Sequence, residues 1–424
     1  MNYDETLEFL YSALPMYQRV GTIAVKKDLT NIRLLCKALG NPQDRFRSVH
    51  IAGTNGKGSS AHMLAAILHV AGYKTGLYTS PHLKNFTERI KINGREIPES
   101  EVTRIVAGNK ELLEQIKPSF FEMSVVMAFE YFARQNVDIA IVETGLGGRL
   151  DSTNILNPEV VLITNISLDH TQMLGNTITK IAVEKGGIIK RNTPVVISES
   201  DIQTTDVFKR IASEKNASIT FADTIYTWDD TGTRLFDNHN KQIVCISGTN
   251  YLPEYQLKNI PGVLAVTELL RRKQYNIEED AVTHGLCDFQ KLTHFKGRWQ
   301  VIYDKPLTIC DTAHNIAGIN EVIKEINKLQ FRKLHMVWGM VDDKDAVKIC
   351  SLLPKHASYY FCKPDIPRGM PAERLHTAAK KAGLKGSIIK NVDRAITEAI
   401  KQAHSDDLIF IGGSTFVVAE IKDI

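Results

Sequence analysis

Residues 47–66, RSVHIAGTNGKGSSAHMLAA, give the strongest local signal in the chain. Residues 47–52 form a short apolar run that predicts a buried strand, and the apolar periodicity of residues 59–71 predicts a helix. Between them lies a glycine-rich turn, residues 53–59. Glycines let the backbone fold back with its N–H groups pointing inward, and the helix presents its positive dipole end to the same place. The stretch therefore predicts a strand–loop–helix unit that binds phosphate.

The side chains of this loop suit a nucleotide. Lys57 would supply a positive charge to the β- and γ-phosphates, and Ser59 would reach a metal ion. The loop departs from the pattern G-x-x-x-x-G-K-[ST], because Gly58 follows the lysine and the first glycine stands one position late. The flanking strand and helix still favour nucleotide phosphate over a structural turn. We expect these residues to contact the nucleotide: Thr54, Asn55, Gly56, Lys57, Gly58 and Ser59.

Strands and helices alternate beyond this unit. Further apolar runs predict strands at residues 75–79, 137–143, 160–164 and 194–198, with helical patterns between them, including one near residues 101–115. This alternation predicts an α/β domain with a mostly parallel sheet covered by helices on both faces. Residues 218–250 are rich in Thr, Asp, Trp and Asn and predict a small antiparallel β excursion.

A second α/β series follows Gly297. Its apolar runs predict four strands separated by helical segments, at residues 307–310, 334–338, 358–362 and 408–411. A segment of about 130 residues can form its own core. We therefore expect two domains, a P-loop-containing, mostly parallel sheet domain at residues 1–292 and a smaller Rossmann-like α/β domain at residues 293–424.

The overall composition excludes several classes of protein. The 424 residues include 52 basic and 48 acidic side chains, and a net charge of +4 gives no reason to expect nucleic acid or a membrane as partner. No run of about 18 apolar residues is present, and the acidic N-terminus does not resemble a signal peptide. The six cysteines are scattered, without a zinc or disulfide pattern. These features predict a cytoplasmic protein with free thiols.

Three polar side chains stand at or just beyond the ends of predicted strands: Ser80, Glu143 and His170. The carboxyl ends of parallel strands form the edge at which α/β proteins bind ligands. A hydroxyl, a carboxylate and an imidazole there could share one divalent ion. Singly, a serine before proline is usually a turn residue, and a histidine after a strand is usually a cap. Their common placement is what predicts a metal site.

Several longer motifs carry a recognisable pattern. They are VHIAGTNGKGSSAHML (residues 49–64), GLYTSPHLKNFTERIKINGREIPE (76–99), VETGLGGRLDSTN (142–154), NISLDHTQMLGNTITKIAVEKGGIIK (165–190), QLKN (256–259), FKGRWQ (295–300), DTAHNIAG (311–318), GMVDDKD (339–345) and IFIGGSTFVVAE (409–420). Together they resemble the folylpolyglutamate synthase and dihydrofolate synthase family, which is related to the Mur peptidoglycan ligases. The resemblance runs along the whole chain and is weakest between residues 198 and 250.

The resemblance implies an acid–amino acid ligase whose first domain is similar to the Mur ligase central domain. Such an enzyme joins L-glutamate to the carboxylate of dihydropteroate or of a tetrahydrofolate polyglutamate tail. It uses ATP and Mg²⁺, with K⁺ or a second Mg²⁺, passes through an acyl phosphate, and releases ADP and phosphate. The family also implies a bifunctional monomer that acts on small molecules. Which folate is preferred, and the length of the glutamate chain, stay open.

The resemblance also assigns roles to individual residues. It makes Ser80, Glu143 and His170 magnesium ligands. Lys185 matches a lysine that the family carries as a carbamate, a modification that needs a neutral amine; an exposed helix lysine is the alternative. His314, in the DTAHN motif, and His170 are both candidates for the group that accepts the proton of the amine.

Two further sets follow from the resemblance. The residues that match nucleotide-contacting positions are Asn259, Arg298 and Asp311. The residues that match the surface binding the pterin substrate are Ser119, Phe120, Phe121, Glu122, Leu150, Asp151 and Ser152. An aromatic pair such as Phe120–Phe121 is more commonly part of a core. Residues 28–33 could also help to bind the pterin, or could simply form a packing helix.

Two alternatives remain at this point. A Mur-type ligase acting on a UDP-muramyl peptide would need an extra domain before the phosphate loop, and only 52 residues precede Gly53. A nucleotide switch without ligase chemistry would explain the phosphate loop. It would leave the DTAHN motif, Arg298 and the second α/β series without a role.

Overall fold

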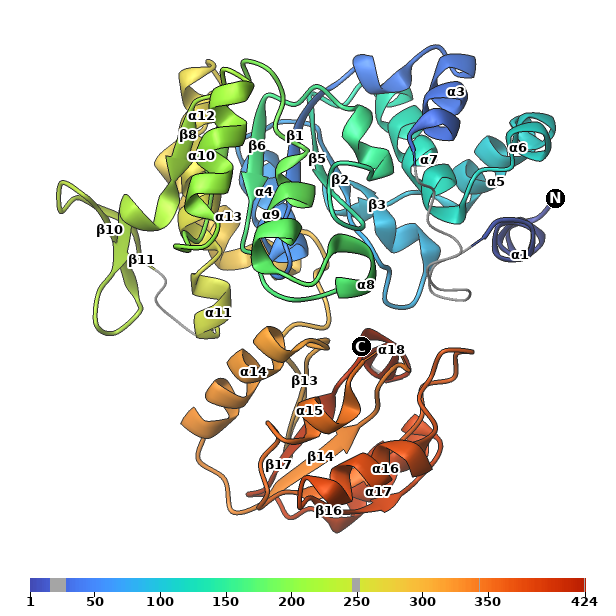
Figure 1. Ribbon diagram of the computed structural model, residues 1–424, viewed down its shortest axis with the longest axis vertical. Coiled ribbons are helices and arrows are strands. Elements are labelled where there is room, and N and C mark those ends of the chain that lie inside the picture. Colours follow the sequence, from blue (N-terminus) through green and yellow to red (C-terminus); the bar gives the residue numbers. More distant parts are fainter. Residues whose placement is uncertain (16–27, 246–251, 343, 423) are drawn as a thin grey trace. The chain divides into compact units, whose positions relative to one another are not determined.

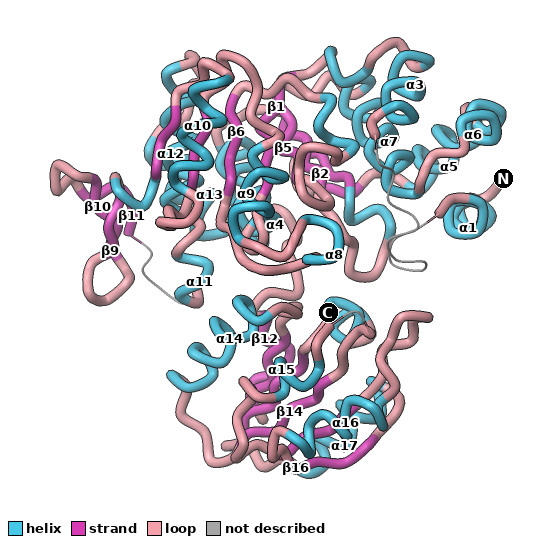
Figure 2. The backbone as a smooth tube through the Cα atoms, in the orientation of Figure 1, coloured by secondary structure: helices cyan, strands magenta, loops and turns pink. Residues whose placement is uncertain are grey.

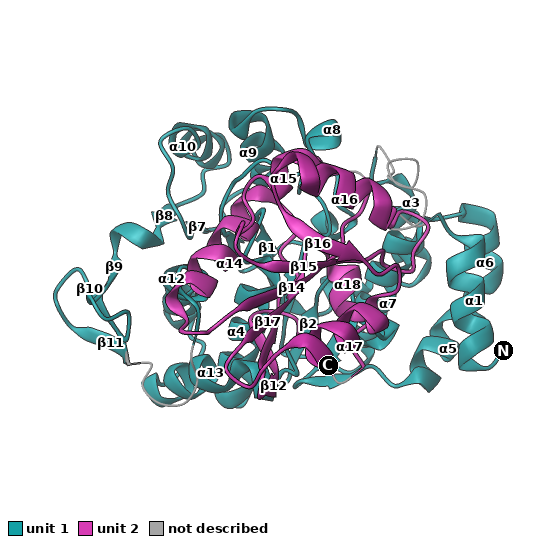
Figure 3. Cartoon of the chain, turned by 90° about the horizontal axis from the view of Figure 1, so that it is seen from below, with its two compact units in different colours: residues 1–295 teal, residues 296–424 magenta. Residues whose placement is uncertain are grey.

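The structure is a computed structural model that describes residues 1–15, 28–245, 252–342, 344–422 and 424. The chain divides into two compact units, Met1–Phe295 and Lys296–Ile424, shown in different colours in Figure 3. Within the described residues, the first unit is built on a sheet of eight strands and the second on a sheet of six. Each unit therefore has its own layers of strands and helices.

The main sheet of the first unit has the strand order β4-β3-β2-β5-β1-β6-β7-β8. Its strands are β1 (Arg47–Ala52), β2 (Thr75–Tyr78), β3 (Ile90–Ile92), β4 (Arg95–Glu96), β5 (Ile139–Glu143), β6 (Val160–Ile163), β7 (Val195–Ile197) and β8 (Ile219–Phe221). Strands β2, β5, β1, β6, β7 and β8 run parallel, and β3 and β4 extend one edge antiparallel. The predicted mostly parallel sheet is confirmed.

Helices cover both faces of this sheet (Figure 1). One face packs against α4 (Lys57–Val70), α12 (Ile260–Arg272) and α13 (Glu279–Leu292). The other packs against α7 (Phe120–Arg134), α9 (Ile178–Gly186) and α10 (Thr205–Glu214). Because alternate strand residues point to opposite faces, Val49 and Ile51 contact the first set while Ala52 contacts the second. Burial on both faces explains the continuous apolar runs of the strands.

Shorter elements complete the first unit. The further helices are α1 (Tyr3–Ala13), α3 (Thr30–Ala38), α5 (Glu99–Gly108), α6 (Lys110–Ile116), α8 (Thr171–Leu174) and α11 (Glu254–Leu257), with 3₁₀ turns η2 (Pro42–Asp44), η3 (Phe86–Arg89), η4 (Ser152–Ile155) and η5 (Ala222–Thr224). The prediction of one helix near residues 101–115 was wrong, because the chain breaks at Asn109, which ends α5 and begins α6. Asparagine is unfavourable inside a helix, because its side chain forms hydrogen bonds with nearby backbone groups in non-helical conformations, and it therefore favours helix boundaries.

A separate antiparallel sheet of β9 (Tyr226–Trp228), β10 (Arg234–Asp237) and β11 (Gln242–Cys245) lies within the stretch expected to form a β excursion (Figure 2). The beginning of that stretch differs from the expectation, since β8 pairs with β7 as a parallel strand of the main sheet. Periodicity in a three-residue strand cannot tell which sheet it joins. Residues 246–250 of the expected excursion lie outside the described residues.

The second unit is a smaller α/β layer structure with the strand order β12-β13-β17-β14-β15-β16. Its strands are β12 (Gln300–Asp304), β13 (Leu307–Cys310), β14 (Leu334–Trp338), β15 (Ser358–Phe361), β16 (Lys385–Ile388) and β17 (Leu408–Gly412), and its helices are α14 (Ile316–Lys328), α15 (Ala346–Cys350), α16 (Ala372–Lys381), α17 (Val392–Gln402) and α18 (Thr415–Ala419). All neighbours except the antiparallel pair β12 and β13 run parallel. In the part of the chain that the structure describes, no helix is long and apolar enough to cross a bilayer.

Candidate active site

The phosphate loop joins β1 to α4 at the carboxyl edge of the main sheet. Gly56 caps α4 with a φ of +84°, and no side chain caps the first N–H groups of this helix. An added Cβ at Gly56 would lie 2.1 Å from Oδ1 of Asn259, and one at Gly53 would lie 1.8 Å from Oγ1 of Thr164. Both positions therefore require glycine. The result is a helix N-terminus whose backbone donors suit an anion.

The loop is held by the segment that follows β6. The backbone N–H of Thr54 donates to the carbonyl of Asn165 at 2.8 Å, and its hydroxyl donates to the carbonyl of Ser167 at 3.1 Å. The backbone N–H of Asn55 donates to Oδ1 of Asn165 at 3.1 Å. Thr164 Oγ1 in turn donates to the carbonyl of Asn55 at 2.6 Å. Sequence reasoning did not assign these partners, although their position directly after a strand at the same edge is a usable signal.

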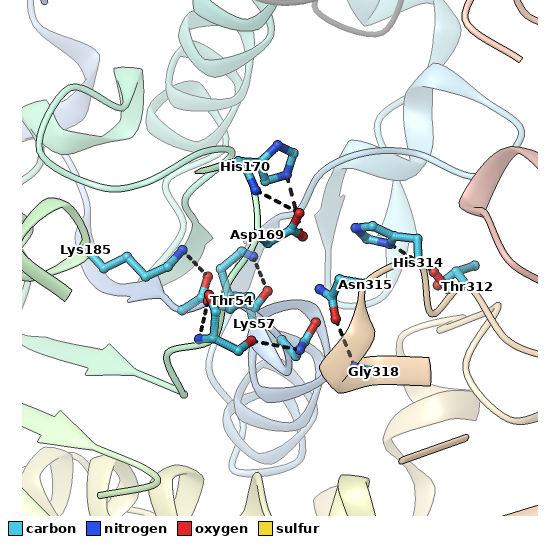
Figure 4. A network of polar contacts seen from close by, with 12 residues as sticks. Thr54, Lys57, Asp169, His170, Lys185, Thr312, His314, Asn315 and Gly318 are labelled. Atoms are coloured by element: carbon cyan, nitrogen blue, oxygen red, sulfur yellow. Dashed lines mark hydrogen bonds and ion pairs between the residues drawn. The ribbon is translucent and has the colours of Figure 1, made fainter. Parts of the chain in front are cut away.

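Lys57 lies between the loop and a buried carboxylate. Its Nζ donates to the carbonyl of Thr54 at 3.2 Å, as Figure 4 shows, and lies 4.0 Å from Oε1 of Glu143. Glu143 ends β5 with 5% exposure, and its Oε2 accepts the backbone N–H of Ser80 at 3.1 Å. The structure thus brings Lys57, Glu143 and Ser80 together at one sheet edge.

The remaining predicted metal ligand, His170, caps the short helix α8 with a φ of +48°. Its Nε2 lies 3.8 Å from Oδ2 of Asp169, and its backbone N–H donates to Oδ1 of the same residue at 2.8 Å (Figure 4). No group of three His, Cys, Asp or Glu side chains that could hold a metal occurs among the described residues. Oxygen donors such as the Ser80 hydroxyl and the Glu143 carboxylate nevertheless suit Mg²⁺, which usually takes one or two carboxylates and completes its shell with phosphates and water.

Lys185 is buried rather than exposed. It lies in α9 with 5% exposure, and its Nζ donates to the carbonyl of Gly53 at 2.7 Å (Figure 4). Burial and the nearby charge of Lys57 lower the pKa of the Lys185 amine to about 7, against the opposing charges of Asp169 and Asp151. A substantial fraction of this amine is therefore neutral near pH 7. The alternative of an exposed helix lysine was wrong.

The first part of the expected substrate surface forms a helix cap. Ser119 caps α7, and Oε2 of Glu122 accepts both the Ser119 backbone N–H at 2.7 Å and its hydroxyl at 2.9 Å. Phe120 is 3% exposed and belongs to the core. The ring of Phe121 borders Gly145, where an added Cβ would approach it to 2.5 Å. Phe121 therefore lies against the glycine-rich segment after β5.

The second part of the expected substrate surface supports that same segment. Asp151 accepts the backbone N–H of Leu146 at 2.8 Å and both the backbone N–H and the hydroxyl of Thr153, at 3.0 and 2.5 Å. Burial raises the pKa of Asp151, against these hydrogen bonds. Ser152 is buried at 8% exposure, whereas Leu150 is 38% exposed. The buried Asp151 side chain thus holds the loop through hydrogen bonds, whereas the Leu150 side chain is exposed to solvent.

The predicted residues of the second unit cluster around the DTAHN motif, between β13 and α14. Asp311 is buried and accepts the backbone N–H groups of Trp299 at 2.9 Å and Ala313 at 2.8 Å. Nδ1 of His314 lies 3.1 Å from the carbonyl of Thr312 (Figure 4), which can only accept, so Nε2 is the basic nitrogen. Arg298 donates to the carbonyl of its neighbour Gly297 at 3.3 Å.

Comparisons with known proteins agree with this arrangement. Residues 51–267 match the Mur ligase middle domain, and residues 297–415 match the Mur ligase glutamate ligase domain. The folylpolyglutamate synthase of Lacticaseibacillus casei is 31% identical over 446 residues, covering 100% of this chain and 98% of that protein. The probable bifunctional folylpolyglutamate synthase/dihydropteroate synthase of Haloferax volcanii is 32% identical over 443 residues, covering 100% of this chain. This chain spans about half (50%) of the length of that second relative.

Solved structures give the same result. Escherichia coli FolC in complex with DHPP and ADP has a TM-score of 0.87 and 28% identity, covering 99% of this chain and 96% of that one. A bifunctional folylpolyglutamate synthase/dihydrofolate synthase with Mn, AMPPNP and L-glutamate bound has a TM-score of 0.85 and 28% identity, covering 99% and 97%. The chain therefore belongs to the folylpolyglutamate synthase/dihydrofolate synthase family of Mur ligases.

Proposed function

We propose that this protein is an ATP-dependent ligase that joins L-glutamate to the carboxylate of dihydropteroate or of a reduced folate. The observation that carries the proposal is the uncapped helix N-terminus after Gly56, with Lys57 beside the buried carboxylate of Glu143. Relatives with the same fold hold ADP, AMPPNP and L-glutamate. The bifunctional names of several relatives support the use of both acids.

The reaction needs activation of a poor electrophile. The carboxylate of the acid attacks the γ-phosphorus of ATP, an acyl phosphate forms, and ADP leaves. The amine of glutamate then attacks the acyl carbon, and phosphate departs. Lys57 and the backbone N–H groups at the start of α4 stabilise the charge that develops on the transferred phosphoryl group. These groups act by position and charge alone.

We propose Ser80, Glu143 and His170 as the ligands of Mg²⁺. Ser80 follows β2 by two residues and Glu143 ends the neighbouring strand β5, and the backbone N–H of Ser80 already donates to Glu143. The magnesium ion would neutralise the phosphates and align the γ-phosphoryl group for transfer. The remaining loop residues, Thr54, Asn55, Gly58 and Ser59, complete the proposed phosphate site.

A carbamate at Lys185 fits its environment. The neutral amine attacks CO₂, a bond forms between Nζ and carbon, and the amine proton is lost to solvent. The product is an anion, which in this buried place beside Lys57 would bind a cation such as K⁺ or a second Mg²⁺. The burial of Lys185 and its lowered pKa support this modification.

The remaining candidate residues are assigned to ligands from their positions in the fold. Asn259 meets Gly56 of the phosphate loop, and we assign it, with Arg298 and Asp311 of the second unit, to the nucleotide. His314, through Nε2, and His170 are candidates to accept the proton of the attacking amine. The segments around Phe121 and Leu150 would bind the pterin. We further propose a monomer with a cytoplasmic location, and the free thiols of Cys36, Cys287, Cys310, Cys350 and Cys362 support the location.

A substrate-omission assay tests the proposal. Purified protein receives ATP, labelled glutamate, and either dihydropteroate or tetrahydrofolate. Ligation predicts that ADP and labelled product appear together and that both need the acid and glutamate. Release of phosphate at the same rate without glutamate would indicate a nucleotide switch instead. Comparing the two acids shows whether the enzyme is bifunctional.

A further inference from the structure

The loop that carries Ser80, here called the serine loop, comprises residues 79–85 between β2 and η3. Several of its residues, including Pro81, Lys84 and Asn85, are exposed. An exposed loop has few packing contacts to fix its backbone. Ser80 nevertheless has to stay in register with Glu143, whose Oε2 it meets at 3.1 Å through its backbone N–H. Something outside the loop must therefore supply the rigidity.

The Glu88 side chain ties down the second half of the serine loop. Its Oε2 accepts the backbone N–H of Leu83 at 2.6 Å. Its Oε1 accepts the N–H groups of Lys84 at 3.0 Å and Asn85 at 2.9 Å. One carboxylate thus satisfies three consecutive backbone donors, and such charge-assisted bonds are stronger than neutral ones.

Arg89 ties down both ends of the segment that contains Ser80. Its carbonyl accepts the backbone N–H of Thr79 at 3.0 Å, and its Nε donates to Nδ1 of His82 at 2.8 Å. A guanidinium can only donate, so Nδ1 of His82 accepts and the ring proton lies on Nε2. Ser80 and Pro81 are the residues between these two attachments.

Arginine is an unusual residue at a buried position whose role is only to hold a loop in place. It is 3% exposed, and its guanidinium carbon lies 5.2 Å above the ring of Phe120. The groups that favour its charge are the hydroxyls of Tyr78 and Tyr11 and, after them, the carboxylate of Glu143. Burying a cation among mainly neutral partners costs free energy that an apolar side chain would avoid. The planar, fixed donor geometry of arginine is what such a position gains.

We propose that Glu88 and Arg89 are positioning residues that clamp the serine loop and thereby set the Ser80 hydroxyl beside Glu143 for the divalent cation. This inference rests on the proposed function, because it takes Ser80 and Glu143 as metal ligands. Neither clamp residue touches the metal. They act as the partners behind metal ligands do, whose loss typically lowers metal affinity about 10- to 100-fold.

The test is a titration of Mn²⁺ into the full chain with saturating ADP, followed by electron paramagnetic resonance of the free ion. The variants are Arg89→Met, which keeps bulk and removes the donors, Arg89→Lys, and Glu88→Gln, which keeps size but removes one acceptor oxygen. Arg104→Met is the matched control, since Arg104 is a half-exposed arginine of the same unit that pairs with Glu101 and Glu130. Thermal unfolding and ADP affinity without metal are measured for every variant.

The clamp predicts that Mn²⁺ affinity falls about 10-fold or more in Arg89→Met and several-fold in Glu88→Gln, with partial recovery in Arg89→Lys. The affinity of these variants for ADP without metal should stay near that of wild type. The control Arg104→Met should bind Mn²⁺ as wild type does. Variants that lose thermal stability but bind Mn²⁺ like wild type would show a purely structural role and overturn the inference. If Arg89→Met fails to fold, Glu88→Gln decides alone. Failure of the wild-type protein itself to bind Mn²⁺ with ADP would instead overturn the proposed metal site.

Discussion

Two buried polar regions of the molecule differ in what satisfies their polar groups. In the second unit, Asp407 accepts two hydrogen bonds from Arg332 at 3.0 Å each and one from the backbone N–H of His404 at 2.9 Å, and it contacts Nε2 of His335 at 3.2 Å. Nδ1 of His335 meets the hydroxyl of Tyr360 at 3.0 Å. In the first unit, the start of α4 has no side-chain cap. Both regions bury charged side chains. They differ because the backbone N–H groups at the start of α4 have no capping side chain and can donate to an anion.

The position in the sheet agrees with this difference. Arg332 and Asp407 precede β14 and β17, at the amino ends of parallel strands, whereas the phosphate loop follows the carboxyl end of β1. Ligands of α/β sheets bind at the carboxyl ends. We therefore expect substitutions in the first region to change turnover and substitutions in the second to change stability.

The largest expected effect is that of Lys57→Ala. Removing one preorganised donor to developing charge typically costs about 10²- to 10³-fold in rate, so ligation should fall by at least that factor. The thermal unfolding temperature should stay close to that of wild type, because the removed amine donates to the carbonyl of Thr54 and lies 4.0 Å from Oε1 of Glu143, at the outer limit of an ion pair. Steady-state assays and a melting curve check both points. Near-normal turnover would contradict the assigned role.

The next effect concerns the Lys185 amine. Lys185→Met keeps the volume of the side chain but cannot form a carbamate, so activity should fall by about 10- to 100-fold. Wild-type protein incubated with ¹³C-bicarbonate should show a carbamate resonance that the variant lacks. A wild-type spectrum without that resonance would remove the carbamate from the mechanism, whatever the activity of the variant.

Asp407→Asn should act on stability instead. The substitution removes the charge that holds Arg332 and His335, and we expect the free energy of unfolding to fall by about 2–3 kcal/mol. Turnover of the folded enzyme should change less than about two-fold, since nothing at the carboxyl edge is altered. Urea unfolding followed by tryptophan fluorescence measures the first quantity. If Asp407→Asn lost most of its turnover while keeping wild-type stability, the expected difference between the two regions would be wrong.

The same carboxylate predicts a dependence of stability on pH. Burial would raise the pKa of Asp407, but His404, Arg332 and His335 outweigh it and lower that pKa from 3.8 to about 2. Because the folded pKa lies below the unfolded one, the contribution is fully present above about pH 4 and is lost as the pH falls towards 2. It amounts to about 2 kcal/mol. Acid unfolding of wild type and Asp407→Asn should therefore converge at low pH.

The smallest expected effect is that of Thr54→Val. The variant loses the hydroxyl that exchanges hydrogen bonds with the backbone of Ser167, at 3.1 and 3.0 Å. We expect about 1 kcal/mol of lost stability and a modest rise in KM for ATP, because the phosphate loop loses one of its attachments. An ATP titration checks the second quantity, and an unchanged KM would show that the other attachments suffice.

The predictions from sequence were most accurate where a local pattern has one structural solution. The strand Arg47–Ala52, the glycine loop and the helix after it follow from periodicity and from backbone freedom, and the structure has the same elements. The runs at residues 307–310 and 334–338 likewise match β13 and β14 to the residue. The S-x-x-E spacing of Ser119 and Glu122 is itself a capping-box signature. The structure has this capping box at the start of α7, whereas these two residues were interpreted from the sequence only as part of the pterin-binding surface.

What sequence alone could not decide depended on contacts between distant segments. The burial of Lys185 requires the carbonyl of Gly53, 132 positions away, and the exclusion of any side chain at Gly56 requires Asn259. Local sequence is enough to specify the strand–loop–helix unit and the alternation of strands and helices, because hydrophobic periodicity and glycine act over a few residues. Contacts across the fold specify that the Lys185 amine has a lowered pKa and that Glu143 is the carboxylate beside Lys57. Desolvation and charge are set by everything packed around a group, wherever it stands in the chain.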